Sequence, residues 1–160
     1  MTVLGIDPGY AIVGYGVLDT NGMIPKAYGV IRTEAGIDIE DRLSEIYDNM
    51  CELLCTFKPD HVAIEKLYFN TNEKTAINVS QARGVILLAC VKCGVKVYEY
   101  TPLQVKMSVV GYGRAEKQQV MDMTKRLLRL KKIPRPDDAA DALAIALCHA
   151  NSQGSLLMNL

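Results

Sequence analysis

The chain contains no tryptophan and only two histidines, and its 160 residues carry no net charge. So few imidazoles disfavour both a zinc enzyme with histidine ligands and a hydrolase whose serine or cysteine needs a histidine base. No apolar run reaches the roughly 18 residues that cross a bilayer, and no basic, cleavable leader precedes the first apolar segment. We therefore expect a cytoplasmic protein that does not enter a membrane.

The rest of the composition is that of a globular protein, with 49% hydrophobic and 22% charged residues. This length suits one domain, which we place at residues 1–151, with residues 152–160 as a flexible tail. The zero net charge hides an asymmetry. Residues 1–80 hold 6 Lys/Arg and 12 Asp/Glu, whereas residues 81–160 hold 12 and 6. A basic face beside an acidic pocket would result, unless folding mixes the halves.

The five cysteines do not form a recognisable framework. Cys90 and Cys93 have the spacing of half a zinc knuckle, but no second Cys or His pair is suitably placed to complete it. Cys51 and Cys55 lie four residues apart on a predicted helix, where a disulfide is not expected. Free thiols in a reducing compartment are the simplest interpretation.

Apolar periodicity and turn residues predict three strands in an antiparallel meander, followed by alternating helices and strands. Thr101-Pro102 has the residues of a helix start, with Thr as cap and Pro in the first position. The pattern indicates an α/β fold with a five-stranded mixed sheet flanked by helices. The expected strands are 2–7, 12–20, 25–33, 61–65 and 95–100, and the expected helices are 38–57, 75–93, one from 102, 115–130 and 137–151.

Acidic residues end apolar segments at three distant points. Asp7 ends the first strand before Pro8-Gly9, Glu65 ends the fourth, and Asp138 and Asp141 open the last helix. Asp141 is the one charged residue in an apolar, Ala-rich stretch, so the helix should be buried and the carboxylate should need a partner. Each acid alone also has an ordinary interpretation, as a turn, strand-end or capping residue.

Together, the acids indicate a metal site. Like charges repel and buried acids resist ionisation, and a divalent cation removes both costs. Oxygen ligands without histidine or cysteine favour Mg²⁺ or Mn²⁺ over zinc, so metal-assisted chemistry on phosphate is expected. Asp137 is assigned to helix capping. His149 shares the helical spacing of Asp138 and Asp141 and is a candidate border residue of the site.

Several further motifs, taken with these acids, resemble the RuvC family of Holliday-junction resolvases over residues 2–150. The motifs are Asp7-Pro-Gly, Glu65, Gln81-Ala-Arg-Gly84, Val105-Lys106 with Val109-Val110-Gly111, Ala115-Glu-Lys117 and Asp138-Ala-Ala-Asp141-Ala-Leu-Ala-Ile-Ala. The resemblance implies a ribonuclease-H-like fold and a homodimer that works with a branch-migration helicase complex. It also implies paired symmetric nicks in a four-way DNA junction, in DNA recombination and repair.

The resemblance also implies roles for residues. Asp7, Glu65, Asp138 and Asp141 match the catalytic acids, which would hold Mg²⁺, with Mn²⁺ as a possible substitute and two ions per site. Hydrolysis by two such ions leaves 5′-phosphate and 3′-hydroxyl ends. The remaining matches are two basic catalytic and DNA-binding positions, Lys106 and Lys117, and a base-stacking aromatic at Tyr68, where the family has Phe.

Other candidate DNA-binding residues follow from the chain itself. Phe69 adjoins Tyr68 in a polar segment with Lys74, where an aromatic pair suits stacking on unpaired bases. Arg83 and Arg114 are candidates for contacts with backbone phosphates. The helix at 75–93 has more apolar surface than one face requires and is the candidate dimer surface.

Three other functions are compatible with part of the sequence. The acids alone would also suit a hydrolase of RNA–DNA hybrids. Asp7-Pro-Gly9 with Gly14 and Gly16 resembles the first phosphate loop of actin-like nucleotide-binding proteins, although 160 residues cannot supply their second half. A catalytically silent DNA-binding scaffold is the third, and the retention of all four acids argues against it.

Overall fold

The computed structural model describes the backbone of residues 1–67 and 73–158, and the side chains of residues 1–67 and 75–153. In this part of the chain, no helix combines the length and the apolar character needed to cross a membrane.

The predicted five-stranded mixed sheet is confirmed. Its strands lie in the order β3-β2-β1-β4-β5. The first three pair antiparallel and β1, β4 and β5 pair parallel, because the meander returns through short turns whereas helices connect the later strands. The bounds are β1 Thr2–Asp7, β2 Ile12–Asp19, β3 Ile24–Arg32, β4 His61–Glu65 and β5 Lys96–Tyr100.

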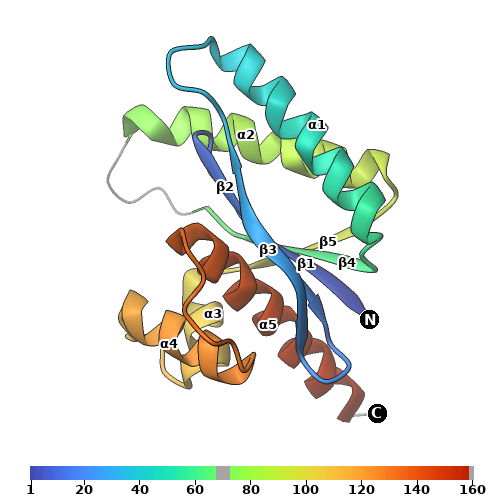
Figure 1. The fold of residues 1–160 in the computed structure, drawn as a ribbon, viewed down its shortest axis with the longest axis vertical. Helices are drawn as coiled ribbons and strands as arrows, with labels where there is room; N and C mark the ends of the chain where they lie inside the picture. Colours follow the sequence, from blue (N-terminus) through green and yellow to red (C-terminus); the bar gives the residue numbers. More distant parts are fainter. Residues whose placement is uncertain (68–72, 159–160) are drawn as a thin grey trace.

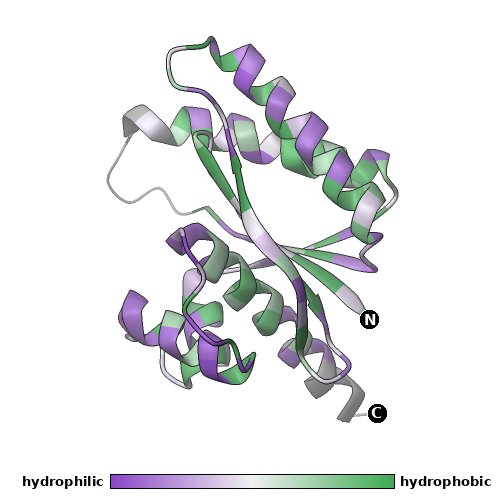
Figure 2. Ribbon diagram, in the orientation of Figure 1, coloured by the Kyte–Doolittle hydropathy of each residue, from purple (hydrophilic) through white to green (hydrophobic). Residues whose placement is uncertain are grey.

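Helices cover both faces of the sheet (Figure 1). One layer holds α1, Ile39–Phe57, and α2, Glu73–Lys92; the other holds α3, Pro102–Val110, α4, Lys117–Leu127, and α5, Asp137–Met158. Helix α5 contacts all five strands. Figure 2 shows its largely apolar middle, against the alternating apolar and polar residues of α1.

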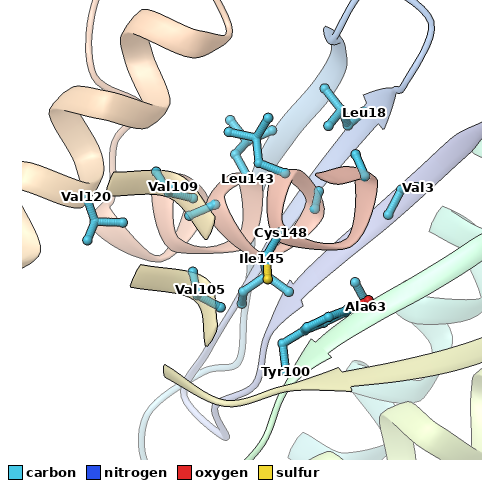
Figure 3. Close-up of a cluster of buried hydrophobic side chains, with 14 of the residues drawn as sticks. Val3, Leu18, Ala63, Tyr100, Val105, Val109, Val120, Leu143, Ile145 and Cys148 are labelled. Carbon is cyan, nitrogen blue, oxygen red and sulfur yellow. The ribbon is translucent and has the colours of Figure 1, made fainter. Parts of the chain in front are cut away.

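Each sheet face has its own hydrophobic core because strand side chains alternate between faces. In β1, Leu4 and Ile6 pack in the core under α1 and α2. Val3 packs in the core under α5, together with Leu143 and Ile145 of that helix (Figure 3). All five side chains are fully or almost fully buried.

Glycines allow α5 to approach the sheet closely. Gly5 and Gly16 are paired across β1 and β2, and Gly14 pairs with Asp7. A Cβ atom on Gly5 would overlap the carbonyl oxygen of Ala142, and one on Gly14 would overlap that of Asp138. Only residues without a side chain fit between these strands and the helix.

Helix ends follow local sequence in some places and not in others. The expected start of α3 is confirmed, and Thr101 and Gln104 form a reciprocal capping box there. Helix α4 is shorter than expected. The sequence predicts that the last helix ends at 151, which is wrong, because α5 continues to Met158. The chain has no breaker at this point, and the Ser152 hydroxyl donates to the carbonyl of Cys148, one turn back.

Candidate active site

Two of the predicted acids lie at the carboxyl ends of adjacent parallel strands. Ile6 of β1 pairs with Ile64 of β4, so Asp7 and Glu65 each follow one residue later. Because Ile6 and Ile64 point into the α1–α2 core, the alternation along each strand turns both carboxylates towards α5. The sheet register therefore brings together two acids that are 58 residues apart in sequence.

Helix α5 supplies the other two acids. Asp138 and Asp141 lie in its first turns, and the glycine positions of β1 and β2 hold this end of the helix against the sheet. Asp7, Glu65 and Asp141 line one pocket of about 200 Å³. Asp138 is close enough to raise the pKa of both Asp7 and Asp141 by its charge. The structure thus brings Asp7, Glu65 and Asp141 together in one pocket and places Asp138 close to Asp7 and Asp141.

The pocket also holds both predicted lysines. Lys106 of α3 and Lys117, the first residue of α4, line it beside the acids. Its apolar lining comes from the same helices and from α5, with Pro102, Val105, Val120, Ala144 and Ile145. Charges of both signs therefore face one another against an apolar wall, where they are screened less than at an open surface.

The acids resist ionisation in this setting. Burial, followed by the charges of Glu65, Asp141 and Asp138, holds the pKa of Asp7 well above its ordinary value. Burial and the charge of Asp141 raise the pKa of Glu65. Burial also raises the pKa of Asp141, although Lys117 opposes the rise. The pKa shifts of these acids come first from burial and then from the repulsion between neighbouring carboxylates.

Lys117 is the main counter-charge in the pocket. Its Nζ lies 2.9 Å from Asp141 and 3.7 Å from Asp137. Burial lowers the pKa of Lys117, but the hydrogen bond to Asp141 and the surrounding carboxylates outweigh it, and the pKa is raised. Among the described residues, no group of three Asp, Glu, His or Cys side chains is arranged to hold a metal ion.

The other candidate DNA-binding residues have different surroundings. Arg114 is exposed at the surface. Arg83 forms an ion pair with Glu99 of β5, and its side chain is 17% exposed, so the structure places it against the sheet and not in the acidic pocket. Tyr68, Phe69 and the side chain of Lys74 lie outside the described residues.

The expectation that His149 borders the acidic site is wrong. His149 is fully buried, with Nε2 2.9 Å from Nδ1 of His61 and Nδ1 2.7 Å from the hydroxyl of Tyr100. Burial and the neighbouring His61 lower its pKa to about 4. His149 lies on the same face of α5 as Asp141, but it is eight residues further along, a distance of about 12 Å along the helix axis. The spacing therefore predicts the correct helix face but not the distance from the acidic site.

Sequence reasoning missed the role of the glycines. Gly14 and Gly16 lie in the predicted strand 12–20 and resemble part of a phosphate loop, whereas in the structure they are positions where α5 meets the sheet. Glycine inside a predicted strand is a known signal of close backbone approach. The sequence shows this signal at Gly5, Gly14 and Gly16. It does not show which element approaches the strands at these positions.

A mixed sheet in this order, with helices on both faces and carboxylates converging where β1 and β4 end, defines a ribonuclease-H-like protein. The comparisons with known proteins agree. The family model of the crossover junction endodeoxyribonuclease RuvC matches residues 3–149. A curated relative of that name from Brevibacillus brevis is 58% identical over 152 residues, covering 94% of this chain and 92% of its own.

Solved structures give the same result. The Thermus thermophilus RuvC structure is 38% identical, with a TM-score of 0.90, and the match covers 97% of this chain and 96% of that one. The same protein in complex with Holliday junction substrate matches with a TM-score of 0.89, 36% identity and the same coverage. The chain belongs to the RuvC family of crossover junction endodeoxyribonucleases.

Proposed function

We propose that this protein cuts four-way DNA junctions by hydrolysing phosphodiester bonds, with Asp7, Glu65, Asp138 and Asp141 as its catalytic acids. The observation that carries the proposal is the convergence of Asp7, Glu65 and Asp141 on one pocket, with Asp138 close to two of them, on the scaffold of a family with a junction-bound relative. Paired symmetric nicks with 5′-phosphate and 3′-hydroxyl ends, which a ligase seals, are the proposed products. The proposed setting is DNA recombination and repair in the cytoplasm.

The donor set fits a hard divalent cation. All four groups are carboxylates, and Mg²⁺ and Mn²⁺ prefer oxygen ligands. Burial and, after it, the charges of neighbouring carboxylates raise the pKa values of Asp7, Glu65 and Asp141, and a nearby divalent charge would oppose both effects. We propose that the four acids hold Mg²⁺, or Mn²⁺ in its place, as a pair of ions. Such ions supply an activated water and charge stabilisation at the leaving oxygen.

Lys106 and Lys117 are proposed to bind the phosphate of the DNA strand that is cut. Both line the pocket beside the acids, so an incoming nonbridging oxygen can accept from an ammonium group without leaving the pocket. Lys117 is already held by Asp141 at 2.9 Å, which fixes its position before DNA arrives. The apolar wall formed by Val105, Val120 and Ile145 limits water around the reacting phosphate and so strengthens these interactions.

The surface of α2 supports a homodimer. Three large apolar side chains of this helix are exposed: Ile77 at 67%, Leu88 at 49% and Val91 at 70%. With Gln81 and Gly84, also exposed, they follow a spacing of four, three, four and three residues, which places them on one helix face. A twofold dimer would present two acidic pockets to a junction with two equivalent strands.

Further partners and contacts belong to the same proposal. DNA contacts are proposed for Tyr68, Phe69, Lys74, Arg83 and Arg114, in addition to the two pocket lysines. Arg83 would have to exchange its ion pair with Glu99 for a phosphate. A branch-migration helicase complex is the proposed protein partner, from the resemblance of the motifs to the family.

The test is cleavage of a synthetic mobile four-way junction in Mg²⁺, beside a linear duplex and an RNA–DNA hybrid. Asp7→Asn is compared with Asp48→Asn, which neutralises an exposed acid of α1 in the opposite layer. We expect paired nicks in the junction alone, lost in Asp7→Asn while junction binding persists, and retained in Asp48→Asn. Mg²⁺ should also raise the melting temperature of the wild type more than that of Asp7→Asn.

Other outcomes separate the parts of the proposal. Cutting of the hybrid would keep the metal chemistry and overturn the substrate. Equal cleavage by wild type and Asp7→Asn would remove Asp7 from the catalytic set. Junction binding without cutting of any substrate, in Mg²⁺ or Mn²⁺, would indicate a silent scaffold.

A further inference from the structure

The end of α4 and its connection to α5 carry a run of positive charge that the proposed site does not use. Residues 125–135, the basic segment, contain no acidic residue and six basic ones: Lys125, Arg126, Arg129, Lys131, Lys132 and Arg135. All six are exposed except Lys125, which is partly buried. Among the described residues, only Arg135 of the six forms an ion pair. The basic segment therefore presents cations without counter-charges, which favours an anionic partner.

Apolar residues hold the basic segment against the domain. Leu128 and Pro134 are buried, and Leu130 packs against the core under α5. Because the exposed cations are interspersed with these anchors, their side chains are kept at the surface. The anchors order the backbone before any ligand arrives, so binding requires little further ordering of the chain.

The end of α4 fixes the backbone of Arg129. The N–H of Leu130 donates to the carbonyl of Lys125 at 2.9 Å, and the N–H of Arg129 donates to that of Arg126 at 3.1 Å. With Arg129 at a φ of 52°, this is the Schellman arrangement, in which glycine is usual at that position. The turn therefore presents a long cationic side chain where most helices end on a residue without one.

The basic segment leads back to the acidic pocket. Arg135 pairs with Asp137, whose carboxylate also lies 3.7 Å from Nζ of Lys117, a residue that lines the pocket. Arg126 is nine residues beyond Lys117 on α4, about 14 Å along the helix axis. The basic segment thus runs from the far end of α4 to the edge of the pocket (Figure 1). Because the phosphates of one DNA strand advance by about 3.4 Å per nucleotide, this distance corresponds to about four nucleotides.

We propose that the basic segment binds backbone phosphates in one duplex arm of the four-way junction, a few nucleotides from the phosphate that is cut. This inference rests on the proposed function, because it takes the acidic pocket as the place of cutting. An acidic protein would also match the charge, but the basic segment begins at the edge of the pocket, from which a cut strand must continue into an arm. Phosphate contacts carry no sequence information, so the basic segment adds affinity and orients the arm for every junction.

The test variant is Arg129→Gln/Lys131→Gln/Lys132→Gln, which removes three exposed cations that form no ion pair among the described residues. Lys125 and Arg126 are kept because cations in the last turn of α4 also stabilise the helix. Each phosphate contact contributes about 0.9 to the slope of log affinity against log salt concentration. Loss of three contacts should lower the slope by about 2.7, and junction affinity at 0.1 M salt by up to about 500-fold. The rate of cutting at saturating enzyme should fall far less, because none of the three side chains lines the pocket.

The matched control is Lys58→Gln/Lys92→Gln/Lys96→Gln, which removes the same charge elsewhere. Lys58 caps the end of α1, Lys92 ends α2 and Lys96 begins β5, and all three are exposed. They lie near the amino ends of the parallel strands, whereas Asp7 and Glu65 lie at the carboxyl ends. Screening limits the effect of charges this far from the pocket, so junction affinity should change by less than about threefold.

The experiment uses the full chain of the wild type and both variants. Binding to a synthetic four-way junction is measured by fluorescence anisotropy without divalent ions, over a range of salt concentrations, and single-turnover cutting is measured in Mg²⁺. A second junction carries neutral methylphosphonate links about two to six nucleotides from the cut. These links should weaken binding of the wild type and the control variant but not of the test variant. Circular dichroism and melting temperature establish that each variant is folded.

Three results would overturn the inference. One is a test variant whose salt slope and junction affinity equal those of the control variant, which would leave the basic segment to an acidic protein partner. Another is a wild type whose binding is unaffected by the neutral links. The third is a test variant that the neutral links weaken as much as they weaken the wild type. Failure of the proposed function is distinct, because it would appear as a wild type that neither binds nor cuts the junction, before any variant is compared.

Discussion

Replacing Gly14 by alanine tests how closely α5 must approach the sheet for the acids to converge. Gly14 pairs with Asp7 across β1 and β2. A Cβ atom at this position would overlap the carbonyl oxygen of Asp138 and lie 2.5 Å from its carbonyl carbon. Carbon atoms pack best at about 3.5–4.0 Å, so the first turn of α5 must move by about 1 Å.

The magnitude follows from two opposing effects. Overpacking of this kind costs about 1–3 kcal/mol, and the upper end applies because the obstacle is backbone and not a mobile side chain. Alanine in a strand recovers about 0.5–1 kcal/mol relative to glycine. The expected net loss in the free energy of unfolding is about 2 kcal/mol. Junction cleavage should fall by about 100-fold, the effect expected when a reacting group is displaced by about 1 Å.

The matched control is Gly29→Ala in β3. The nearest atoms to a Cβ there belong to the end of the Tyr15 ring, with Oη at 2.8 Å and Cζ at 3.0 Å. This ring can turn aside, so stability should change by less than about 1 kcal/mol and cleavage should not change. Urea denaturation and single-turnover cleavage of a junction measure both quantities. If Gly14→Ala is as stable and as active as Gly29→Ala, the close approach of α5 is not what positions Asp138.

Two other predictions concern buried polar groups. Burial and the charges of Glu65, Asp141 and Asp138 raise the pKa of Asp7, so its ionisation destabilises the fold as pH rises through that pKa. Without divalent ions, Asp7→Asn should raise the free energy of unfolding at pH 7 by about 1–2 kcal/mol, with no gain below about pH 3, where the carboxyl is protonated in both the folded and the unfolded state. A gain in urea denaturation that does not depend on pH would contradict this. Tyr100→Phe removes the hydroxyl that contacts the buried His149 at 2.7 Å and should cost about 1–3 kcal/mol in thermal denaturation. A change at the exposed Tyr112 should cost less, and an equal cost would refute the role of the buried contact.

Local signals account for the parts of the fold that could be predicted. Strand and helix positions follow from alternation, from helical spacing and from turn residues such as Gly22, which has a φ of 84° in the β2–β3 turn. The capping pair Thr101 and Gln104 is a property of four consecutive residues. Helix α5 continues past 151 to Met158 because the serine and glycine that follow are poor helix formers but do not by themselves end a helix.

The features of the candidate site also fall into two groups, those visible in the local sequence and those set by the packing of distant elements. Asp141 could be found because a lone carboxylate in an apolar helix needs a partner, and that need is visible in sequence. The contact of Lys117 with Asp141 and the position of His149 beside Tyr100 could not be found from the sequence. Both depend on where along α5 the other elements pack. The packing of α5 on Gly5, Gly14 and Gly16 depends on strand register, which no single segment encodes.

Helix α5 also affects when the site can exist. The candidate site joins Asp7, on the first strand of the fold, to Asp141 and the nearby Asp138, on its last helix. During synthesis, the first strand leaves the ribosome long before the last helix does, so a chain still being made holds at most half of its acidic groups. The same holds for a mature molecule in which α5 has detached from the sheet. If these acids are catalytic as proposed, DNA cleavage requires the closed fold, and an unfinished chain should not cut DNA.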